Sequence, residues 1–394
     1  MRTDLLTCRH NGIQEADLPI MLEKIGVSSV DELIDKTIPT NIRLQEPLPL
    51  AAPMTERQFA EHIADLASQN KLYTSYIGMG WYDAICPAVI QRNVFENPAW
   101  YTSYTPYQAE VSQGRLEALL NFQTAVSDLT AMPLANCSLL DEATAAAEAA
   151  NMMFALRSRD QQKKGANVLF VDENIFPQNL AVIRTRVIPQ GMTILVGDYK
   201  TLEFAPEIFG CIIQYPNSNG SVEDYREFVE KAHAANCKVA VDADILSLAM
   251  LVPPGEWGAD IVFGSTQRLG IPMFYGGPSA AYFATRDEFK RNMPGRIIGL
   301  SKDKYGKLCY RMALQTREQH IKREKATSNI CTAQALLATM AGFYACYHGQ
   351  DGIKTIAKRI HSIATYLNKA LTKLGFVQKN ELFFDTLCIE LPEH

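Results

Sequence analysis

The sequence lacks the features of several common protein classes. Its nine cysteines are scattered, with no Cys-x-x-Cys pair, which argues against a zinc site or a disulfide framework and for a reducing compartment. No apolar run is long enough to span a membrane, and the start of the chain is too charged to form a signal-peptide core. The net charge of −5 gives no sign of a nucleic-acid partner. We therefore expect a cytoplasmic protein that binds neither membranes nor nucleic acids and holds no metal.

The composition that is present belongs to an ordinary globular protein, with 47% hydrophobic and 21% charged residues. A length of 394 residues suits two domains, or one large domain with appendages. We expect a helical arm over 1–70, a large α/β domain over 71–330 and the start of a small domain over 331–394. The last part supplies two helices and one strand, at 383–391, which is too little for a complete domain. We therefore expect the chain to be a fragment.

From residue 166 the sequence alternates short apolar runs with amphipathic stretches. Strands are expected at 168–171, 193–196, 211–214, 239–241 and 260–263, with helices at 177–186 and 222–235. This alternation predicts a mainly parallel, doubly wound α/β sheet. A last strand at 280–284 follows a glycine turn with no helix before it, so it could run antiparallel. Such sheets bind ligands beyond the carboxyl ends of their strands, where Asp242, Ser265 and Asn217 fall.

Two of these strand ends carry residues with a known use in pyridoxal-phosphate (PLP) enzymes of the aspartate aminotransferase fold. In those enzymes a strand-end acid keeps the pyridine nitrogen protonated, and a lysine in a Ser-x-x-Lys loop forms the Schiff base. Asp242 and Ser265 supply the acid and the serine, but Gln267 and Arg268 stand where the lysine belongs. Arginine stays protonated and cannot form an imine. The pattern is that of a PLP site without its covalent anchor.

The turn before an alanine-rich helix has two interpretations. In PLP enzymes of this fold, such a turn binds the cofactor phosphate through the helix N-terminus. The residues that would do so here are Ser138, Glu142, Ala143 and Thr144. The alternative is a capped helix whose alanines permit close packing. This second interpretation is favoured, because Asp141 and Glu142 would repel a phosphate.

Two further segments also have two interpretations each. The aromatic segment 73–115 is either a loop that its rings anchor to the core or the wall of a small-molecule pocket. The residues best suited to such a wall precede a helix over 111–131: Tyr104, Thr105, Tyr107 and Gln108. The Gly-rich, basic segment 294–327 is expected to be a loop. A solvated surface is the simpler interpretation, and docking of an anion or a partner is the alternative.

Five stretches resemble the N-terminal half of the glycine cleavage system P-protein. They are residues 75–83 (SYIGMGWYD), 97–117 (NPAWYTSYTPYQAEVSQGRLE), 138–148 (SLLDEATAAAE), 315–320 (QTREQH) and 323–331 (REKATSNIC). The resemblance covers essentially the whole chain. It implies fold type I of the PLP-dependent transferases and the activity of glycine dehydrogenase (decarboxylating). That enzyme removes CO₂ from glycine and passes the aminomethyl group to the lipoyl arm of the H-protein.

The family has two homologous halves, sometimes separate subunits, and its C-terminal half binds PLP covalently through a lysine. The resemblance therefore implies that this chain is the lysine-less half, which forms a dimer-like pair with the other half and closes its pocket with Tyr104 and Tyr107. Asp242 and the turn at Ser138 would be remnants of a second, unused site. Phe176 stands where the family usually has histidine, which also weighs against a working site. The alternative is a non-catalytic scaffold or regulatory protein on the same fold.

Overall fold

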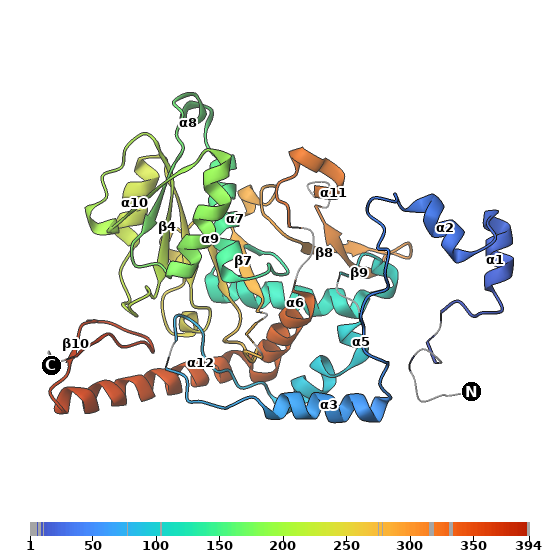
Figure 1. Cartoon of the computed structure of the whole chain (residues 1–394). Coiled ribbons are helices and arrows are strands. Elements are labelled where there is room, and N and C mark those ends of the chain that lie inside the picture. The colour runs from blue at the N-terminus through green and yellow to red at the C-terminus, as the bar shows by residue number, and fades with distance from the viewer. Residues whose placement is uncertain are drawn as a thin grey trace. The chain divides into compact units, whose positions relative to one another are not determined.

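The computed structural model describes residues 6, 9–10, 12–76, 78–102, 105–274, 276–277, 279–314, 319–330 and 334–391. The chain divides into two compact units, Met1–Ile77 and Gly78–His394. Figure 1 labels several of the helices and strands of both units. None of the helices in the described part of the chain is long and apolar enough to cross a membrane.

Three α-helices lie in the described part of the first unit. They are α1 (Leu18–Ile25), α2 (Val30–Thr37) and α3 (Glu56–Ser68). Thr55 begins α3 with a capping box, in which its side chain and that of Gln58 each bond the other residue's backbone N–H. No residue of these helices is buried, and Phe59 of α3 is 57% exposed. The helices are therefore held by their caps and local bonds and not by a core of their own.

The second unit contains a seven-stranded sheet in the order β1-β7-β6-β5-β4-β2-β3. Its strands are β1 (Leu134–Ala135), β2 (Val168–Asp172), β3 (Thr193–Gly197), β4 (Ile208–Tyr215), β5 (Lys238–Ala243), β6 (Ile261–Ser265) and β7 (Ala281–Thr285). Strands β2 to β6 pair in parallel, whereas β7 pairs antiparallel with β6 and β1. The predicted parallel sheet and its antiparallel last strand are confirmed.

Helices cover both faces of this sheet (Figure 1). They are α6 (Gln113–Thr130), α7 (Glu142–Ala155), α9 (Pro177–Val187), α10 (Arg226–Ala234) and α12 (Ala335–Lys373). Helices α6, α10 and α12 share one buried cluster with Val239 and Val241 of β5, whereas α7 and α9 share another with the intervening Ala240. Successive side chains of a strand point to opposite faces, so a sheet covered on both faces needs apolar residues throughout. This explains the unbroken apolar runs of β4 and β5.

Short helices precede α6 in the described part of the aromatic segment. They are α4 (Ala88–Ile90), a π-helical turn (Gln91–Phe95) and α5 (Pro98–Tyr101). The ring of Trp100 meets Phe343 of α12 edge-on, with centroids 5.5 Å apart. This contact agrees with the first interpretation of the segment, in which its aromatic rings anchor it to the core. Another short helix, α8 (Arg159–Lys163), lies between α7 and β2.

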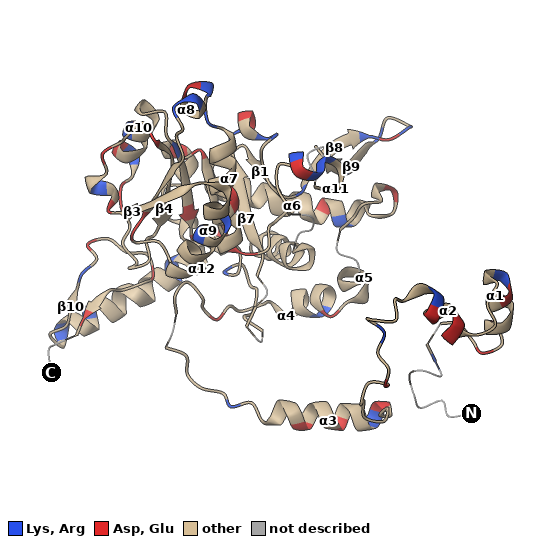
Figure 2. Cartoon of the chain, turned by 45° about the horizontal axis from the view of Figure 1, so that its top comes forward, with Lys and Arg blue, Asp and Glu red and all other residues tan. Residues whose placement is uncertain are grey.

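The prediction of a loop over 294–327 is wrong. Strands β8 (Ile297–Lys302) and β9 (Leu308–Ala313) form an antiparallel hairpin there, followed by the short helix α11 (Gln319–Lys322). The Gln123 side chain of α6 bonds both the N–H and the carbonyl of Ile298, at 2.7 and 3.1 Å. Figure 2 shows that basic residues lie on the hairpin and on α11, where Lys304 and Lys322 are exposed. Because of these charges, the sequence analysis did not predict the two short strands. A side-chain amide of α6 holds them in place.

The predicted strand over 383–391 is largely wrong as well. Only β11 (Ile389–Glu390) forms there, paired with β10 (Val377–Gln378). Residues 380–386, called the closing segment below, lie instead against the loop that follows β4. Phe384 is 1% exposed and packs in a small apolar cluster, and an isolated bridge joins Phe383 to Ser221. Side-chain packing and single backbone contacts therefore hold this part of the chain, and not a continuous strand.

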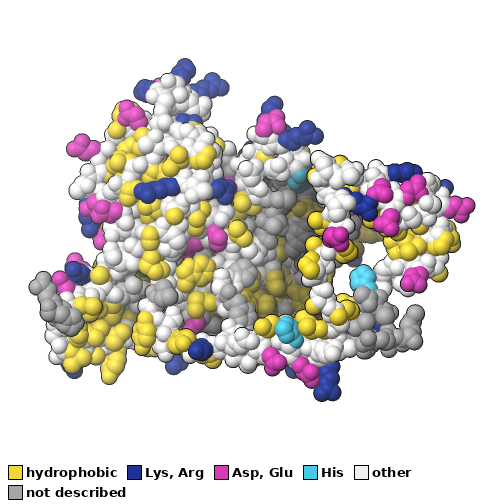
Figure 3. Space-filling view, viewed as in Figure 1, with side chains coloured by type: hydrophobic (Ala, Val, Ile, Leu, Met, Phe, Trp, Pro, Cys, Tyr) yellow, Lys and Arg dark blue, Asp and Glu magenta, His cyan; other side chains and the backbone are white. Residues whose placement is uncertain are grey.

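The second stretch of α12 carries apolar residues on its outer surface. Helix α12 is interrupted at Gly349, whose φ of 63° is not helical, so the two helices predicted here are present. After this break Ile363, Tyr366 and Leu367 are 59%, 76% and 49% exposed. Figure 3 shows hydrophobic side chains gathered at the end of the molecule where α12 and β10 lie. A helix apolar on both its inner and outer faces is typical of one that a partner segment covers.

Candidate functional site

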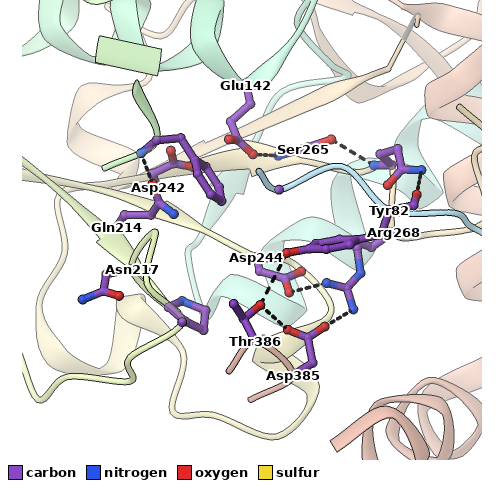
Figure 4. A pocket seen from close by; sticks show the side chains of 15 residues that line it. Tyr82, Glu142, Gln214, Asn217, Asp242, Asp244, Ser265, Arg268, Asp385 and Thr386 are labelled. Carbon is purple, nitrogen blue, oxygen red and sulfur yellow. Dashed lines mark hydrogen bonds and ion pairs between the residues drawn. The ribbon is translucent and has the colours of Figure 1, made fainter. Parts of the chain in front are cut away.

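A small pocket lies beyond the carboxyl ends of β4, β5 and β6 (Figure 4). It is lined by Gly80, Tyr82, Glu142, Phe176, Gln214, Pro216, Asn217, Gly220, Asp242, Asp244, Ser265, Gln267, Arg268, Asp385 and Thr386. The structure thus brings together six residues that the sequence pointed to: Asn217, Glu142, Asp242, Ser265, Gln267 and Arg268. The pocket encloses about 60 Å³, well below the roughly 300–1,000 Å³ of sites that bury a small organic ligand.

Two carboxyl groups share one amide donor on the inner side of the pocket. Asn179 of α9 donates to Asp242 Oδ2 at 2.7 Å and to Glu142 Oε1 at 2.8 Å. Burial, followed by the nearby charge of Glu142, raises the pKa of Asp242 well above its usual range. Burial also raises the pKa of Glu142. The pair therefore carries less negative charge than two free carboxylates would, and Asn179 satisfies one oxygen of each.

Arg268 is ion-paired on the other side of the pocket. Its Nη1 lies 3.0 Å from Asp244 Oδ2, and its Nη2 lies 2.6 Å from Asp385 Oδ2. Burial opposes the charge on the guanidinium, but the two carboxylates outweigh it and raise the pKa of Arg268. Burial raises the pKa of Asp244, an effect that Arg268 partly offsets. The side chain of Arg268 is thus a permanently charged bridge between two acids.

The residues of this pocket do not fit PLP. The phosphate would need the free N–H groups near the start of α7, but Asp141 already accepts from Thr144 N–H at 2.7 Å. Glu142 accepts from Ser265 N–H at 3.1 Å, so a carboxylate already occupies this donor as well. No amine is present at Arg268, and the enclosed volume is small. Of the two interpretations of this turn, the capped helix is the one that the structure contains.

Phe176 narrows the same pocket. Its N–H donates to Gln214 Oε1 at 2.7 Å, which fixes the residue at the start of α9. Gly80 packs directly over the ring: a Cβ on it would lie 2.7 Å from Phe176 Cε2, and its φ is +84°. Only glycine tolerates both this approach and this backbone conformation. The segment around Gly80 therefore closes over Phe176.

The other predicted residues lie outside this pocket. Ser138 is fully buried, and its hydroxyl has no hydrogen-bond partner among the described residues. Ala143 and Thr144 lie in the first turn of α7, while Thr105, Tyr107 and Gln108 precede α6. Tyr104 is outside the described residues. The structure therefore does not bring the proposed wall residues Tyr107 and Gln108 into contact with the acidic pocket.

Sequence reasoning missed four residues of the pocket network: Tyr82, Asn179, Asp244 and Asp385. Asp244 follows β5 by one residue, so its strand-end position was a usable signal. Asp385 is 117 residues from its partner Arg268, and no pattern in the sequence marks that pairing. Tyr82 was noted only as part of the aromatic segment; its hydroxyl lies 3.4 Å from Thr386 Oγ1.

The architecture is that of the PLP-dependent transferases of fold type I. A sphingosine-1-phosphate lyase from Burkholderia pseudomallei superposes with a TM-score of 0.56 at 12% identity, covering 87% of this chain and 79% of that one. An aspartate aminotransferase from Thermus thermophilus superposes with a TM-score of 0.50 at 14% identity, covering 79% and 81%. Similarities at this level of identity show the fold alone. They agree with the predicted fold class.

Within this class the chain belongs to the glycine cleavage system P-protein family, whose model matches residues 8–394. A glycine decarboxylase (P-protein) solved in inhibitor-bound form superposes with a TM-score of 0.85 at 33% identity, covering 95% of this chain and 85% of that one. The glycine dehydrogenase (decarboxylating) of Bacteroides thetaiotaomicron is 78% identical over 394 residues, which is 100% of this chain. The chain spans only 42% of the length of that relative.

Proposed function

We propose that this chain is the lysine-less half of a PLP-dependent glycine dehydrogenase (decarboxylating). The complete enzyme would act in the cytoplasm, remove CO₂ from glycine and transfer the aminomethyl group to the lipoyl group of the H-protein. PLP, which would be bound covalently by the other half, supplies an electron sink for the bond broken at the glycine α-carbon. The two halves would form a dimer-like pair.

The observation that carries this proposal is the double ion pair of Arg268. A catalytic half needs an unhindered amine at this position, and here a guanidinium is committed to Asp244 and Asp385. Relatives named glycine dehydrogenase (decarboxylating) are more than twice as long as this chain. A second portion of the enzyme, absent from this sequence, is therefore available to hold the cofactor. The domain limits expected from the sequence, at 70 and 330, form part of this proposal.

The role proposed for this chain within the pair is to close one wall of the partner's pocket. Tyr107 is 49% exposed, and its hydroxyl accepts a hydrogen bond from Arg296 Nη2 at 2.9 Å. The guanidinium of the buried Arg296 also lies 5.3 Å from the centre of the Tyr107 ring. A ring that one guanidinium contacts at both its hydroxyl and its face can exclude water from a neighbouring site with little loss of side-chain entropy. Thr105 and Gln108 flank it and would extend the same wall.

Reconstitution tests the proposal. The chain is mixed with a separately expressed lysine-bearing half from a close relative, and glycine–CO₂ exchange is measured in the presence of PLP and H-protein. We expect exchange only in the mixture, with a 1:1 complex by size-exclusion chromatography. A stable complex that gives no exchange, although the intact relative is active in the same assay, would contradict the proposal and favour the scaffold.

Variants of the wall test the role of this chain in the same mixture. Tyr107→Ala should lower the exchange rate by about tenfold or more, because water would enter the site and glycine would lose its positioning. Tyr107→Phe keeps the ring and should retain most of the rate. Tyr305→Ala is the matched control, because Tyr305 is 74% exposed in the hairpin loop. Equal rates for Tyr107→Ala and Tyr305→Ala would remove Tyr107 from the wall.

A further inference from the structure

The closing segment forms part of the wall of the pocket. Its residues Asp385 and Thr386 are part of the lining. Backbone and side-chain bonds attach it to the loop after β4, where Val222 N–H donates to the Leu382 carbonyl at 3.0 Å. Asn380 Nδ2 donates to the Asn219 carbonyl at 2.7 Å. The segment therefore follows the edge of the sheet that carries the acids.

One side chain connects this segment to two other parts of the site. Arg268, from the turn after β6, reaches Asp244 after β5 with one terminal nitrogen and Asp385 with the other (Figure 4). The three side chains are 13%, 21% and 15% exposed, so water screens these ion pairs only weakly. A guanidinium has two terminal nitrogens at a fixed separation, whereas a lysine offers a single ammonium.

The fit beneath the segment leaves little room. A Cβ on Gly220 would lie 2.4 Å from the Thr386 carbonyl oxygen, and Gly220 has a φ of +85°. On the other side, Phe384 is buried, and its carbonyl lies 2.7 Å from Nδ1 of His361 in α12. The closing segment is therefore packed on both sides, and its Asp385 forms one of the two ion pairs of Arg268.

We propose that Arg268 is a conformational lock, which converts the position of the cofactor lysine into a clamp on the closing segment. Many enzymes open and close a segment over the active site in each catalytic cycle. Here Arg268 holds the segment closed, and with it the β10–β11 pair that flanks the segment in sequence. The lock thereby also keeps the exposed apolar surface of the second stretch of α12 in one position. This proposal does not depend on the glycine dehydrogenase activity.

Hydrogen exchange of the Val222 amide measures the lock, because this amide bonds the closing segment directly. Wild type is compared with Arg268→Gln and with Asp385→Asn, an isosteric change that should not disturb folding. We expect the Val222 amide to exchange about 100-fold faster in both variants. Arg268→Gln leaves Asp244 and Asp385 without their cation, and Asp385→Asn removes the charge through which Arg268 holds the closing segment. Amides of α7 should keep their wild-type rates. The double variant should exchange no faster than either single one.

Glu390→Gln is the matched control. Glu390 pairs with Lys379 at 3.5 Å across the neighbouring β10–β11 pair, and both side chains are more than half exposed. It should leave the Val222 rate within threefold of wild type. Val222 rates within threefold of wild type in Arg268→Gln and Asp385→Asn would overturn the lock. An equal acceleration in α7 would overturn it too, because Arg268 would then only stabilise the whole fold.

Discussion

Asp242→Asn should stabilise this chain, and the stabilisation should increase with pH. Asp242 is 2% exposed, faces Glu142 across the amide of Asn179, and has a pKa raised by burial and then by Glu142. The folded chain therefore holds a proton at Asp242 at a pH where the unfolded chain has lost it. Stability from this proton is fully present below the unfolded pKa, near 4, and is lost as the pH rises through the folded pKa.

The magnitude follows from the cost of holding that proton. A group kept neutral in the folded state costs about 1.4 kcal/mol for each pH unit above its unfolded pKa, up to the folded pKa. Asparagine has no proton to take up, and its side-chain oxygen can still accept from Asn179. At pH 7 the free energy of unfolding should therefore rise by on the order of 1–3 kcal/mol. Near pH 4 the variant and wild type should be almost equal.

Urea titrations at pH 4, 5, 6, 7 and 8, followed by tryptophan fluorescence, measure this difference. Asp224→Asn is the control of opposite sign, because hydrogen bonds from Arg226 lower the pKa of the exposed Asp224 to about 2. The ionised Asp224 contributes stability above the unfolded pKa, so its replacement should stabilise at no pH. A pH-independent gap between Asp242→Asn and wild type, or a variant less stable at every pH, would refute the reasoning.

Three further predictions address the fold and the site. Gln123→Ala removes both bonds to Ile298, so urea titration should show a loss of about 2–3 kcal/mol; an unchanged midpoint would mean that water replaces the amide. Thr55→Ala removes the α3 capping box and should speed amide exchange in α3 about fivefold, whereas Ser68→Ala at the other end should not. Arg268→Lys supplies an amine, but Glu142 still accepts the hydrogen bond from Ser265 N–H. Added PLP should therefore give no visible absorption band that borohydride reduces. Such a band would show that the pocket accepts the cofactor.

The parts of the site that follow strand ends could be predicted from the sequence. Asp242, Ser265 and Arg268 each come within a few residues of an apolar run, and parallel strands bring such ends to one edge. Strands β2 to β7 of the sheet were predictable for the same reason, because each is marked by a local pattern, whereas the two-residue β1 was not predicted. The β8–β9 hairpin was missed because its lysines lie on exposed positions, and their charge outweighed a short alternation.

The contacts that close the pocket could not be predicted in this way. Asn179 and Asp242 are 63 residues apart, and Arg268 and Asp385 are 117 apart. These pairs form because tertiary packing places α9 and the closing segment over the same edge of the sheet. No local periodicity distinguishes Asp385 from the other acids near the end of the chain. The absence of a lysine could therefore be predicted from the sequence, whereas the ion pairs of Arg268 could not.

The acids of this pocket accept hydrogen bonds from donors that the fold places at the carboxyl ends of the strands. The last residue of β6 presents the Ser265 N–H there, and α9 presents the Asn179 amide. A buried donor without an acceptor costs about 1–3 kcal/mol, so a site of this kind needs either a ligand or side chains that accept. Glu142 is the acceptor in this chain. A carboxylate at the start of α7 would repel a phosphate, yet it stabilises the same site when no phosphate binds. Glu142 and Arg268 together therefore indicate a pocket whose hydrogen-bonding groups and charges are satisfied without a cofactor. Neither residue alone indicates this.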